Sequence, residues 1–431
     1  MPHQSPNLRK HLLIVTYSDL SRDGRIQRQL RSLTDHFEIE ILSKRGAEGC
    51  PEWITDAAIH VSLTGHRNEP SETNNRNFGA GRTLSQIAFF PFQAAVRREK
   101  FLYKSLLLIL VLFRMPSKLV SRLFSTNLYG NLREAMENLS SKHVYLCNDQ
   151  GPLPALIDGG IDPRKIHLDL HEYFLSQSPE LDPATRLVRR VNLWVAKKYI
   201  VRVKSISAVA PEIIQKYMKE PFISVRPTLL RNVPEKKDLP PNKTEPDRFT
   251  IVHHGVFSPD RNPLAMVDML CDLDSRFELH LFFTGEISTE FLARCSDHVG
   301  RVFIHKPVSP EDICATISKY DIGLHVLPPT STNMQLALPN KFFEYVQASL
   351  AVVVGPSESM AKMVHSGGFG VVTKSFETRD VVAALNGLTA GSINDMKKAA
   401  YAAAKSLNWE QEGLLLTAAL TELSGLEERK N

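Results

Sequence analysis

The chain of 431 residues has little cysteine and no long apolar segment. Its five cysteines are scattered without a CxxC pair, a pattern that argues against disulfides or a zinc site and favours thiols in a reducing compartment. The uninterrupted apolar run at 105–113 is far short of the ~20 residues that a membrane-spanning helix needs. At the N-terminus, Arg9 and Lys10 precede only a few apolar residues, too few for a signal peptide. We therefore expect a cytoplasmic protein.

Three functional signatures are also absent. The sequence contains no GxGxxG, so dinucleotide binding has little support. The net charge of +5 is too small to indicate nucleic-acid binding by itself, and no motif for RNA or DNA is visible. We therefore expect no nucleic-acid partner. No DxD-type acidic cluster has further ligands in register, so we also expect no metal site.

The composition is that of a globular protein with more than one domain. Hydrophobic residues make up 43% of the chain and charged residues 23%. A chain of this length exceeds one ordinary core and indicates two or three domains. The segment 234–247, rich in proline, lysine and glutamate, is the clearest linker. We therefore expect domains at 1–240 and 248–405, and a final helix within 406–431.

Beyond this linker, apolar strands alternate with helical segments. We expect strands at 249–254, 277–284, 302–305, 322–327 and 351–354, and helices that open near Pro263, Ser288, Pro310, Asn340 and Ser357. Strict alternation with short loops predicts a parallel sheet covered by helices. In such sheets, ligands bind beyond the carboxyl ends of the strands.

The segment 338–356, LPNKFFEYVQASLAVVVGP, is the most informative stretch of the chain. Asn340 as N-cap predicts the start of a short half-buried helix, and the apolar run at 351–354 predicts a buried strand. A helix N-terminus favours an anion, and Lys341 adds a full positive charge, so this pattern predicts a diphosphate cradle. Glu344 lies one turn deeper, where a carboxylate can accept two hydrogen bonds from a ribose diol. The same spacing is equally that of a solvated ion pair between Lys341 and Glu344.

A second cation stands at the start of another helix in the same half. Gly255 follows the strand expected at 249–254, and the next loop leads to Asn262 as N-cap and Pro263 as first helical residue. Arg261 directly precedes this cap. Its guanidinium could therefore clamp a diphosphate together with Lys341.

The N-terminal half begins as a doubly wound sheet. A strand at 12–16, a loop that contains Gly24 and a helix that starts near Arg25 form an opening βαβ unit with the strand at 37–42. Arginines at helix starts are either ligand groups or simply solvated, and both interpretations stay open for Arg25.

Polar residues follow two further strands of this half. Asp149 comes after the strand expected at 143–148, and His171 and Glu172 come after the strand at 166–170. His171 could hydrogen-bond a ligand or transfer a proton, and Asp149 or Glu172 could orient its ring. Packing or a surface hydrogen bond is the alternative explanation for a single histidine.

Two segments of this half are unusual. The polar stretch 48–80 predicts a long loop. The stretch 84–124 is apolar but interleaved with lysines and arginines. A helix in an anionic membrane interface explains this pattern, and so does a buried helix with snorkelling lysines. In the first case the protein contacts the inner face of the membrane.

Several segments, in order along most of the chain, resemble retaining GT-B glycosyltransferases of the family 4 group. PNKFFEY at 339–345 is similar to the donor-site motif of the branch that reads PNK-x-FEY, and DGRIQRQLRSL at 23–33 resembles the R-x-x-R pattern of the first helix. The segments 148–154 and 169–174 resemble the H-D-x-x-x-L-P and D-x-H-E-x-F motifs. Arg261 matches a G-x5-R/K pattern that starts at Gly255.

The resemblance implies an α/β protein of GT-B fold, in which two Rossmann-like doubly wound domains face each other across a cleft and the final helix packs back on the first domain. It implies transfer of a sugar from a nucleotide-diphosphate sugar to a glycan or lipid-linked acceptor, without a metal ion or bound cofactor, in surface polysaccharide or glycoconjugate synthesis. The residues implied are Gly255, Arg261, Asn340, Lys341 and Glu344 for the donor, His171, Glu172 and Asp149 for catalysis, and Gly24 and Arg25 near the acceptor.

Three positions depart from the family pattern. Asn148 stands where many relatives have a histidine, Val256 where they often have an arginine, and Leu336 where many have the first of two glutamates. Two other functions therefore stay open. One is a sugar-nucleotide epimerase of the same architecture, and the other is a non-catalytic GT-B module that binds a partner enzyme.

Overall fold

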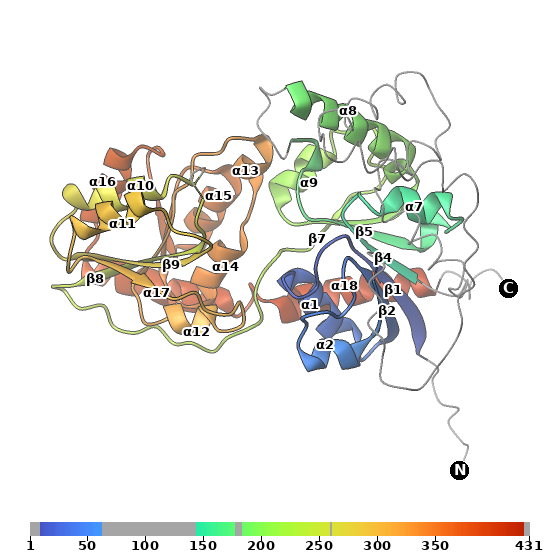
Figure 1. The fold of residues 1–431 in the computed structure, drawn as a ribbon, viewed down its shortest axis with the longest axis horizontal. Helices are drawn as coiled ribbons and strands as arrows, with labels where there is room; N and C mark the ends of the chain where they lie inside the picture. The colour runs from blue at the N-terminus through green and yellow to red at the C-terminus, as the bar shows by residue number, and fades with distance from the viewer. Residues whose placement is uncertain (1–8, 63–143, 177–182, 259–260, 426–431) are drawn as a thin grey trace, which may run out of the picture. The chain divides into compact units, whose positions relative to one another are not determined.

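The structure is a computed structural model, and it describes residues 9–62, 144–176, 183–258 and 261–425 (Figure 1). Contacts divide the chain into two compact units. The first comprises Met1–Ser207, Tyr217–Thr228 and Thr417–Asn431, and the second comprises Ala208–Lys216 and Leu229–Leu416. The segment 234–247, expected as the linker, lies within the second unit.

The first sheet is parallel and doubly wound. Its strands in the described residues are β1 (Lys10–Val15), β2 (Phe37–Ser43), β3 (Ile59–Ser62), β4 (Val144–Asn148), β5 (Ile166–Leu170), β6 (Ser205–Ala208) and β7 (Thr228–Leu229). They follow the order β3-β2-β1-β4-β5-β6-β7, and β1 pairs in parallel with both β2 and β4. The chain thus runs outward from β1 in both directions, so the switch point where such sheets bind ligands lies between β1 and β4.

Helices connect these strands. They are α1 (Gly24–Leu33), α2 (Glu52–Ala57), α7 (Leu153–Asp158), α8 (Pro183–Lys198) and α9 (Pro211–Tyr217), with 3-10 turns at Pro163–Lys165, Phe174–Ser176 and Ile200–Arg202. In α1, Ile26, Leu30 and Leu33 are fully buried, as their spacing along one helix face predicts.

The expectation of a long loop at 48–80 is wrong for its first part. Residues 52–62 form α2 and the edge strand β3, which pairs in parallel with β2. Each element is too short to show a clear hydrophobic period, and Ile54 is the deeply buried residue that anchors α2. The segment 84–124 lies outside the described residues.

The second sheet repeats the same plan. Its strands in the described residues are β8 (Phe249–Val256), β9 (Phe277–Thr284), β10 (Val302–His305), β11 (Ile322–His325), β12 (Ala351–Val354) and β13 (Gly370–Val372). Their order is β10-β9-β8-β11-β12-β13, and the pairings between neighbours are parallel. The prediction of a parallel sheet is confirmed, although the last edge strand, β13, was not expected. Here the switch point lies between β8 and β11.

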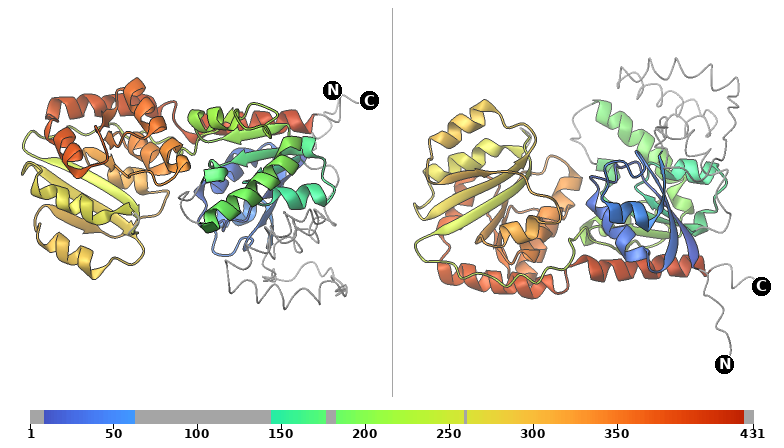
Figure 2. Two further views of the ribbon diagram at one scale, coloured as in Figure 1. Left: turned by 90° about the horizontal axis from the view of Figure 1, so that it is seen from above. Right: turned by 60° about the horizontal axis from the view of Figure 1, so that its bottom comes forward.

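Helices lie on both faces of this sheet (Figure 2). They are α10 (Pro263–Asp268), α11 (Thr289–Ser296), α12 (Ile313–Ile317), α13 (Thr332–Leu336), α14 (Asn340–Gln347), α15 (Glu358–Gly367), α16 (Thr378–Asn386) and α17 (Ala390–Ala404), with a 3-10 turn at Met269–Cys271. The last helix of the described residues, α18 (Trp409–Ser424), follows them in the chain. The boundary between the two units falls within α18, after Leu416, and Lys10 of β1 donates a hydrogen bond to the carbonyl of Ser424 at 3.2 Å.

Side-chain alternation along β11 fixes the position of α14. Ile322 and Leu324 point into the hydrophobic core that α10 and α11 cover. Gly323 therefore faces the opposite side, where the ring of Tyr345 from α14 packs on it so closely that a Cβ would lie 2.3 Å from the ring. The hydroxyl of Tyr345 also donates to the carbonyl of Leu324 at 3.2 Å. This contact anchors α14 against the strand.

The segment 234–247 has no helix or strand, yet it is bonded to the second unit at several points. Ser349 donates to the carbonyl of Leu239 at 2.6 Å, and the hydroxyl of Thr244 donates to the buried carboxylate of Asp321 at 2.6 Å. These bonds hold the segment that the sequence predicts as a linker against the second unit.

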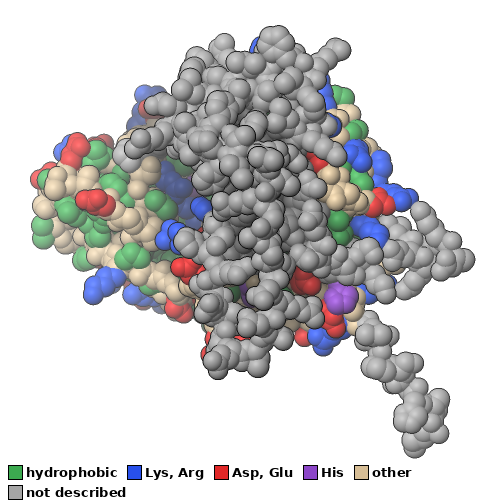
Figure 3. Space-filling view, turned by 45° about the vertical axis from the view of Figure 1, so that its right-hand side comes forward, with side chains coloured by type: hydrophobic (Ala, Val, Ile, Leu, Met, Phe, Trp, Pro, Cys, Tyr) green, Lys and Arg blue, Asp and Glu red, His purple; other side chains and the backbone are tan. Residues whose placement is uncertain are grey.

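Within the described residues, no helix is long and apolar enough to cross a membrane. On the face drawn in Figure 3, lysines and arginines are interspersed with acidic and hydrophobic side chains.

Candidate functional site

Two cationic side chains converge at the carboxyl end of β8. Gly255 has φ +140°, and a Cβ built there would lie 2.8 Å from Nζ of Lys341 and 3.3 Å from Nη1 of Arg261. Any larger residue would therefore meet both side chains as well as backbone strain. The structure thus brings together three residues that the sequence predicts for the donor, at the switch point of the second sheet.

The charge of Lys341 is poorly compensated in this position. Its Nζ donates to the carbonyl of His254 at 2.9 Å. Burial and the neighbouring Arg261 lower the pKa of Lys341 to about 8, against the opposing effect of Glu344. Two cations held together in a partly buried site repel one another, so a bound anion would relieve the repulsion.

The N-terminus of α14 strengthens the preference for an anion. The N-cap of α14 is Pro339, so the expectation that Asn340 caps the helix is wrong; Asn340 is its first residue, exposed, and no side chain caps the helix. Proline has no side-chain acceptor for the first N–H groups of the helix. In α1, by contrast, the carboxylate of Asp23 accepts from the N–H groups of Arg25 and Ile26. The start of α14 is therefore open to an external anion in a way that the start of α1 is not.

Glu344 lies beside a histidine that the sequence analysis did not select. Its carboxylate is 3.2 Å from Nε2 of His254. Burial and then Lys341 lower the pKa of His254 to about 3, so the ring is neutral near pH 7 and the contact is not a pair of opposite charges. The His254 ring also contacts the Tyr345 ring edge-on at 5.3 Å between centroids. A solvated ion pair between Lys341 and Glu344 does not describe this site, because Lys341 is directed to the carbonyl of His254 instead.

The first unit carries a buried charged network at the ends of β4 and β5. Arg25, 2% exposed, donates from Nε and Nη2 to the two carboxylate oxygens of Asp169, both at 2.8 Å. Gln29 donates to the same carboxylate at 2.7 Å and to Oδ1 of Asn148 at 3.0 Å. Ser207 donates to the carboxylate at 2.7 Å. Arg25 is thus neither solvated nor at the surface, and it acts on the site through Asp169.

His171 stands on this network. Its Nε2 is 3.1 Å from Oδ1 of Asn148 and 3.3 Å from Oδ2 of Asp169, while Nδ1 is 3.5 Å from Oδ2 of Asp149. Burial lowers the pKa of His171, but Asp149 and Asp169 outweigh it and raise the pKa above its ordinary value. Burial also disfavours the ionised form of Asp169 and so raises its pKa. Arg25 and His171 outweigh this effect and hold the pKa of Asp169 well below the usual range. One edge of the ring is therefore anchored inward, and the edge beside the half-exposed Asp149 is the one that a ligand can approach.

The remaining predicted residues of this unit lie around the network. Gly24 is the first residue of α1. Glu172 has an exposed side chain, and its carbonyl accepts from the Tyr217 hydroxyl at 2.6 Å. Asp149 has φ +63°, a left-handed conformation that is uncommon outside glycine.

Sequence analysis missed the residues that organise both clusters. Asp169 is part of the D-x-H-E-x-F motif but was not selected, because nothing in a single sequence shows that it pairs with Arg25. His325 is the last residue of β11, and His254 is the last residue of the strand predicted at 249–254, which in the structure continues to Val256. A histidine at the carboxyl end of a predicted strand is the signal that could have found them.

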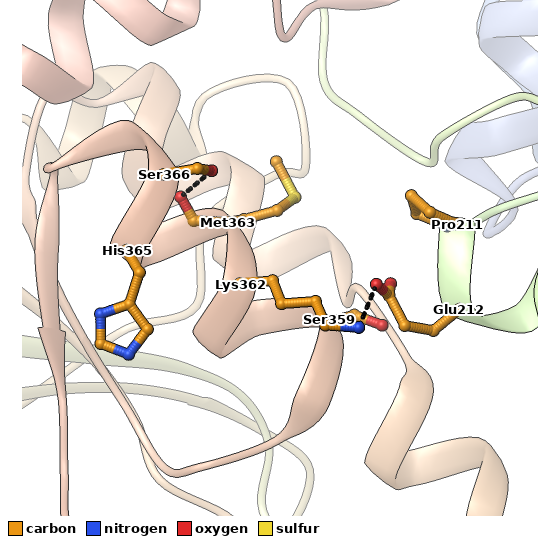
Figure 4. Close-up of a pocket in the computed structure, with 7 residues that line it drawn as sticks. All are labelled: Pro211, Glu212, Ser359, Lys362, Met363, His365 and Ser366. Atoms are coloured by element: carbon orange, nitrogen blue, oxygen red, sulfur yellow. Dashed lines mark hydrogen bonds and ion pairs between the residues drawn. The ribbon is translucent and has the colours of Figure 1, made fainter.

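A separate hollow of about 580 Å³ is lined by α9 and α15 of the second unit (Figure 4). None of the predicted site residues lines it. Its charged groups already pair with one another, since Lys362 bonds Glu212 at 3.1 Å and Glu358 at 2.8 Å. The described residues also contain no group of three or more His, Cys, Asp or Glu that could hold a metal ion.

Replacement of Asp169 by Asn should destabilise the protein by about 3–5 kcal/mol, because it leaves the buried Arg25 without its counter-charge. The contribution of Asp169 is present above its unfolded pKa and is lost as the pH falls towards its depressed folded value. Urea unfolding at pH 7 measures the effect. Asp162→Asn is the control, since it breaks an exposed pair with Arg164 and should change stability by less than about 1 kcal/mol. Equal small effects of the two changes would contradict the network.

Replacement of Lys341 by Met should stabilise the ligand-free protein near pH 7, on the order of 1–2 kcal/mol, because it removes an uncompensated charge. The gain should shrink above pH 8, where the folded wild type has released a proton that the unfolded chain still binds. Thermal unfolding at several pH values measures this difference. The exposed Lys374, changed to Met, is the control and should show no such pH dependence; a pH-independent gain for Lys341→Met would be evidence against the lowered pKa.

Comparisons with known proteins identify the fold. No family model matches the chain, and a search of curated proteins found no match. Among solved structures, sucrose-phosphate synthase from Thermosynechococcus elongatus matches over 96% of this chain and 99% of its own, with a TM-score of 0.65 and 11% identity. HepE from Anabaena, solved with UDP-glucose, matches over 97% and 100%, with a TM-score of 0.61 and 12% identity. TarM from S. aureus, solved with UDP, has a TM-score of 0.53 and 11% identity over 69% of this chain, which spans 59% of TarM.

These neighbours are GT-B glycosyltransferases, and the likeness shows that this chain has their fold, an α/β architecture of two Rossmann-like domains. The N-terminal domain of a trehalose-6-phosphate phosphatase from Candida albicans matches as well, with a TM-score of 0.58 and 10% identity. The fold therefore leaves the reaction to be argued from the residues at the strand ends.

Proposed function

We propose that this protein is a glycosyltransferase that moves a sugar from a nucleotide-diphosphate sugar to an acceptor hydroxyl. The observation that carries the proposal is the convergence of Lys341 and Arg261 over Gly255, beside the uncapped start of α14. The structures of HepE with UDP-glucose and of TarM with UDP support a nucleotide donor for this fold. The PNKFFEY segment supports membership of the PNK-x-FEY branch of the family 4 group, whose members retain the configuration of the sugar.

The donor cluster suits the charge that develops during such a transfer. As the bond to the sugar breaks, negative charge grows on the departing diphosphate, and preorganised cations stabilise that charge more than the ground state. Lys341 and Arg261 supply these cations and the start of α14 supplies N–H groups, so the proposal needs no metal ion and no bound cofactor. Glu344 would hold the ribose of the nucleotide, one turn deeper along α14.

In the first unit, we assign His171 to hydrogen bonding of the acceptor hydroxyl or of the transferred sugar. Asp149 and Asp169 raise its pKa against the effect of burial, which favours a ring that donates hydrogen bonds. Asp149, beside Nδ1, would accept the proton or steady positive charge on the sugar ring, and Glu172 would assist from the exposed side. Gly24 and Arg25 act indirectly, because Arg25 holds Asp169, which in turn holds His171.

The partners proposed are a nucleotide-sugar donor and a glycan or lipid-linked acceptor, in surface polysaccharide or glycoconjugate synthesis. A cytoplasmic protein that contacts the inner face of an anionic membrane would reach such an acceptor. These assignments rest on the resemblance and on the basic, apolar composition of 84–124.

Replacement of Gly255 by Ala should abolish donor binding, because the added Cβ would displace Nζ of Lys341. Gly285→Ala is a matched control: Gly285 also has positive φ, at +93°, but a Cβ there meets nothing within 4 Å. Both variants should lose similar stability from backbone strain, on the order of 1 kcal/mol. Calorimetric titration with UDP-glucose and other nucleotide sugars measures binding. Retained binding in Gly255→Ala, or equal losses of affinity in both variants, would argue against a phosphate-binding site next to Gly255.

Replacement of Lys341 by Ala should slow release of nucleoside diphosphate from the donor about 30- to 1000-fold, which corresponds to about 2–4 kcal/mol of transition-state stabilisation. Lys362→Ala, which removes a lysine paired with Glu212 and Glu358, should leave the rate unchanged. Chromatography of reactions with uridine, guanosine, adenosine and thymidine diphosphate sugars gives the rates. An epimer formed without transfer would favour an epimerase, and absence of any nucleotide binding would favour a non-catalytic module.

A further inference from the structure

A further buried polar side chain, that of His325, lies near the cation pair. His325 is the last residue of β11 and is 8% exposed. Its Nδ1 is buried and makes no hydrogen bond. Leaving a buried polar atom without a partner destabilises a protein by about 1–3 kcal/mol, so a histidine kept purely for packing is an unfavourable choice here.

Strand geometry places His325 in the donor cluster. Side chains alternate along β11, so His325 lies on the same face as Gly323, opposite Ile322 and Leu324 in the hydrophobic core. That face carries α14, whose Tyr345 ring packs on Gly323. His325 is two residues further along the strand, at its carboxyl end, where the switch point opens.

The charges around His325 keep its ring neutral. Burial first, and then Lys341, Arg261 and His254, lower its pKa well below the ordinary value. His253, on the opposite face of β8, uses Nδ1 to bond the carbonyl of Leu324 at 2.9 Å and is likewise held neutral by burial and Lys341. A neutral imidazole carries one proton, and the buried Nδ1 has no acceptor for it. The favoured tautomer therefore places the proton on Nε2. Unlike Nδ1, this nitrogen is not one of the buried atoms that lack a hydrogen-bond partner.

We propose that His325 is a third phosphate-contacting residue of the donor site, whose Nε2–H donates a hydrogen bond to an oxygen of the nucleoside diphosphate held by Lys341 and Arg261. This inference rests on the proposed function, since it names a further contact in the same site. An uncharged donor adds a directed hydrogen bond without adding to the repulsion between the two cations. The proposal places this contact on the second phosphate, the one further from the nucleoside, so a nucleoside monophosphate would lack it.

The test compares two ligands in matched variants. Calorimetry first identifies which of the uridine, guanosine, adenosine and thymidine diphosphates binds the wild type most tightly, and the monophosphate of the same nucleoside is the second probe. His325→Phe keeps an aromatic ring but removes both nitrogens. His325→Gln returns an N–H near the position of Nε2. His280→Phe is the control, because His280 is a buried histidine of β9 that is not part of the donor cluster. Its Nε2 lies 3.4 Å from a carboxylate oxygen of Glu278, and its ring stacks on Phe303.

The expected result is a selective loss of diphosphate affinity. His325→Phe should weaken diphosphate binding about tenfold or more, as expected for one hydrogen bond to a charged group, and should change monophosphate binding less than about twofold. His325→Gln should recover most of the loss, and His280→Phe should behave as wild type. The melting temperature of His325→Phe should be equal or higher, since an unpartnered nitrogen is removed; where Phe is not tolerated, His325→Leu provides the same comparison.

Three results would overturn the inference. Unchanged diphosphate affinity in His325→Phe, with binding abolished in Lys341→Ala, would reject His325 and leave the proposed function in place. Equal losses for the diphosphate and the monophosphate would show that His325 shapes the whole site and does not contact the second phosphate. Failure of every diphosphate to bind the wild type would reject the proposed function, and the role of His325 with it.

Discussion

Two cations held close together over a glycine are the constraint on which the candidate donor site depends. Lys341 and Arg261 meet above Gly255 because the second sheet ends β8 beside the start of α14. Burial, and then the repulsion from Arg261, lower the pKa of Lys341 to about 8. The site without a ligand is therefore less stable than one with a neutral side chain at this position. A bound diphosphate, as proposed above, would remove this penalty. The cation pair thus lowers the stability of the ligand-free protein and raises its affinity for an anion, as is common in sites that recognise charge.

The two candidate clusters use histidine in opposite ways. In the second unit, burial and nearby cations lower the pKa of His254 and His325, so these rings stay neutral. In the first unit, Asp149 and Asp169 raise the pKa of His171 against the effect of burial. The first arrangement suits recognition of an anion by neutral donors beside cations, and the second suits donation to an oxygen of an acceptor or sugar. One residue type thus serves two purposes because its neighbours carry opposite charges.

Much of the second unit could be predicted from the sequence. The strands β9, β10 and β12 have the predicted bounds, and the helix at Asn340 and the cations at Arg261 and Lys341 lie where their patterns indicate. Long apolar runs and clear helix starts specify these elements locally. The failures have local causes too. Residues 52–62 form elements too short to show a period, and the N-cap of α14 is Pro339, one residue earlier than expected.

What the sequence could not supply is which residues meet in space. Arg25 and Asp169 are 144 residues apart, and their pairing follows from β1 and β5 flanking β4. Ser349 has φ +57°, where glycine is favoured, and its hydroxyl donates to the carbonyl of Leu239. His325 joins the cation pair because β8 and β11 are neighbours in the sheet although 65 residues of chain separate the end of one from the start of the other. Sheet order decides the first and the last of these, and it is not visible in local patterns.

Thermal unfolding of the wild-type protein with nucleoside diphosphates tests the central claim most directly. A ligand that binds only the folded protein raises its stability by RT ln(1 + [L]/Kd), so melting temperature reports binding without knowledge of the acceptor. The account predicts that at least one of the uridine, guanosine, adenosine and thymidine diphosphates raises the melting temperature in a concentration-dependent manner, and that the corresponding nucleoside does not. If none of the four diphosphates shifts the transition, or if the nucleoside shifts it equally, the cation pair does not form a diphosphate site and the account is contradicted.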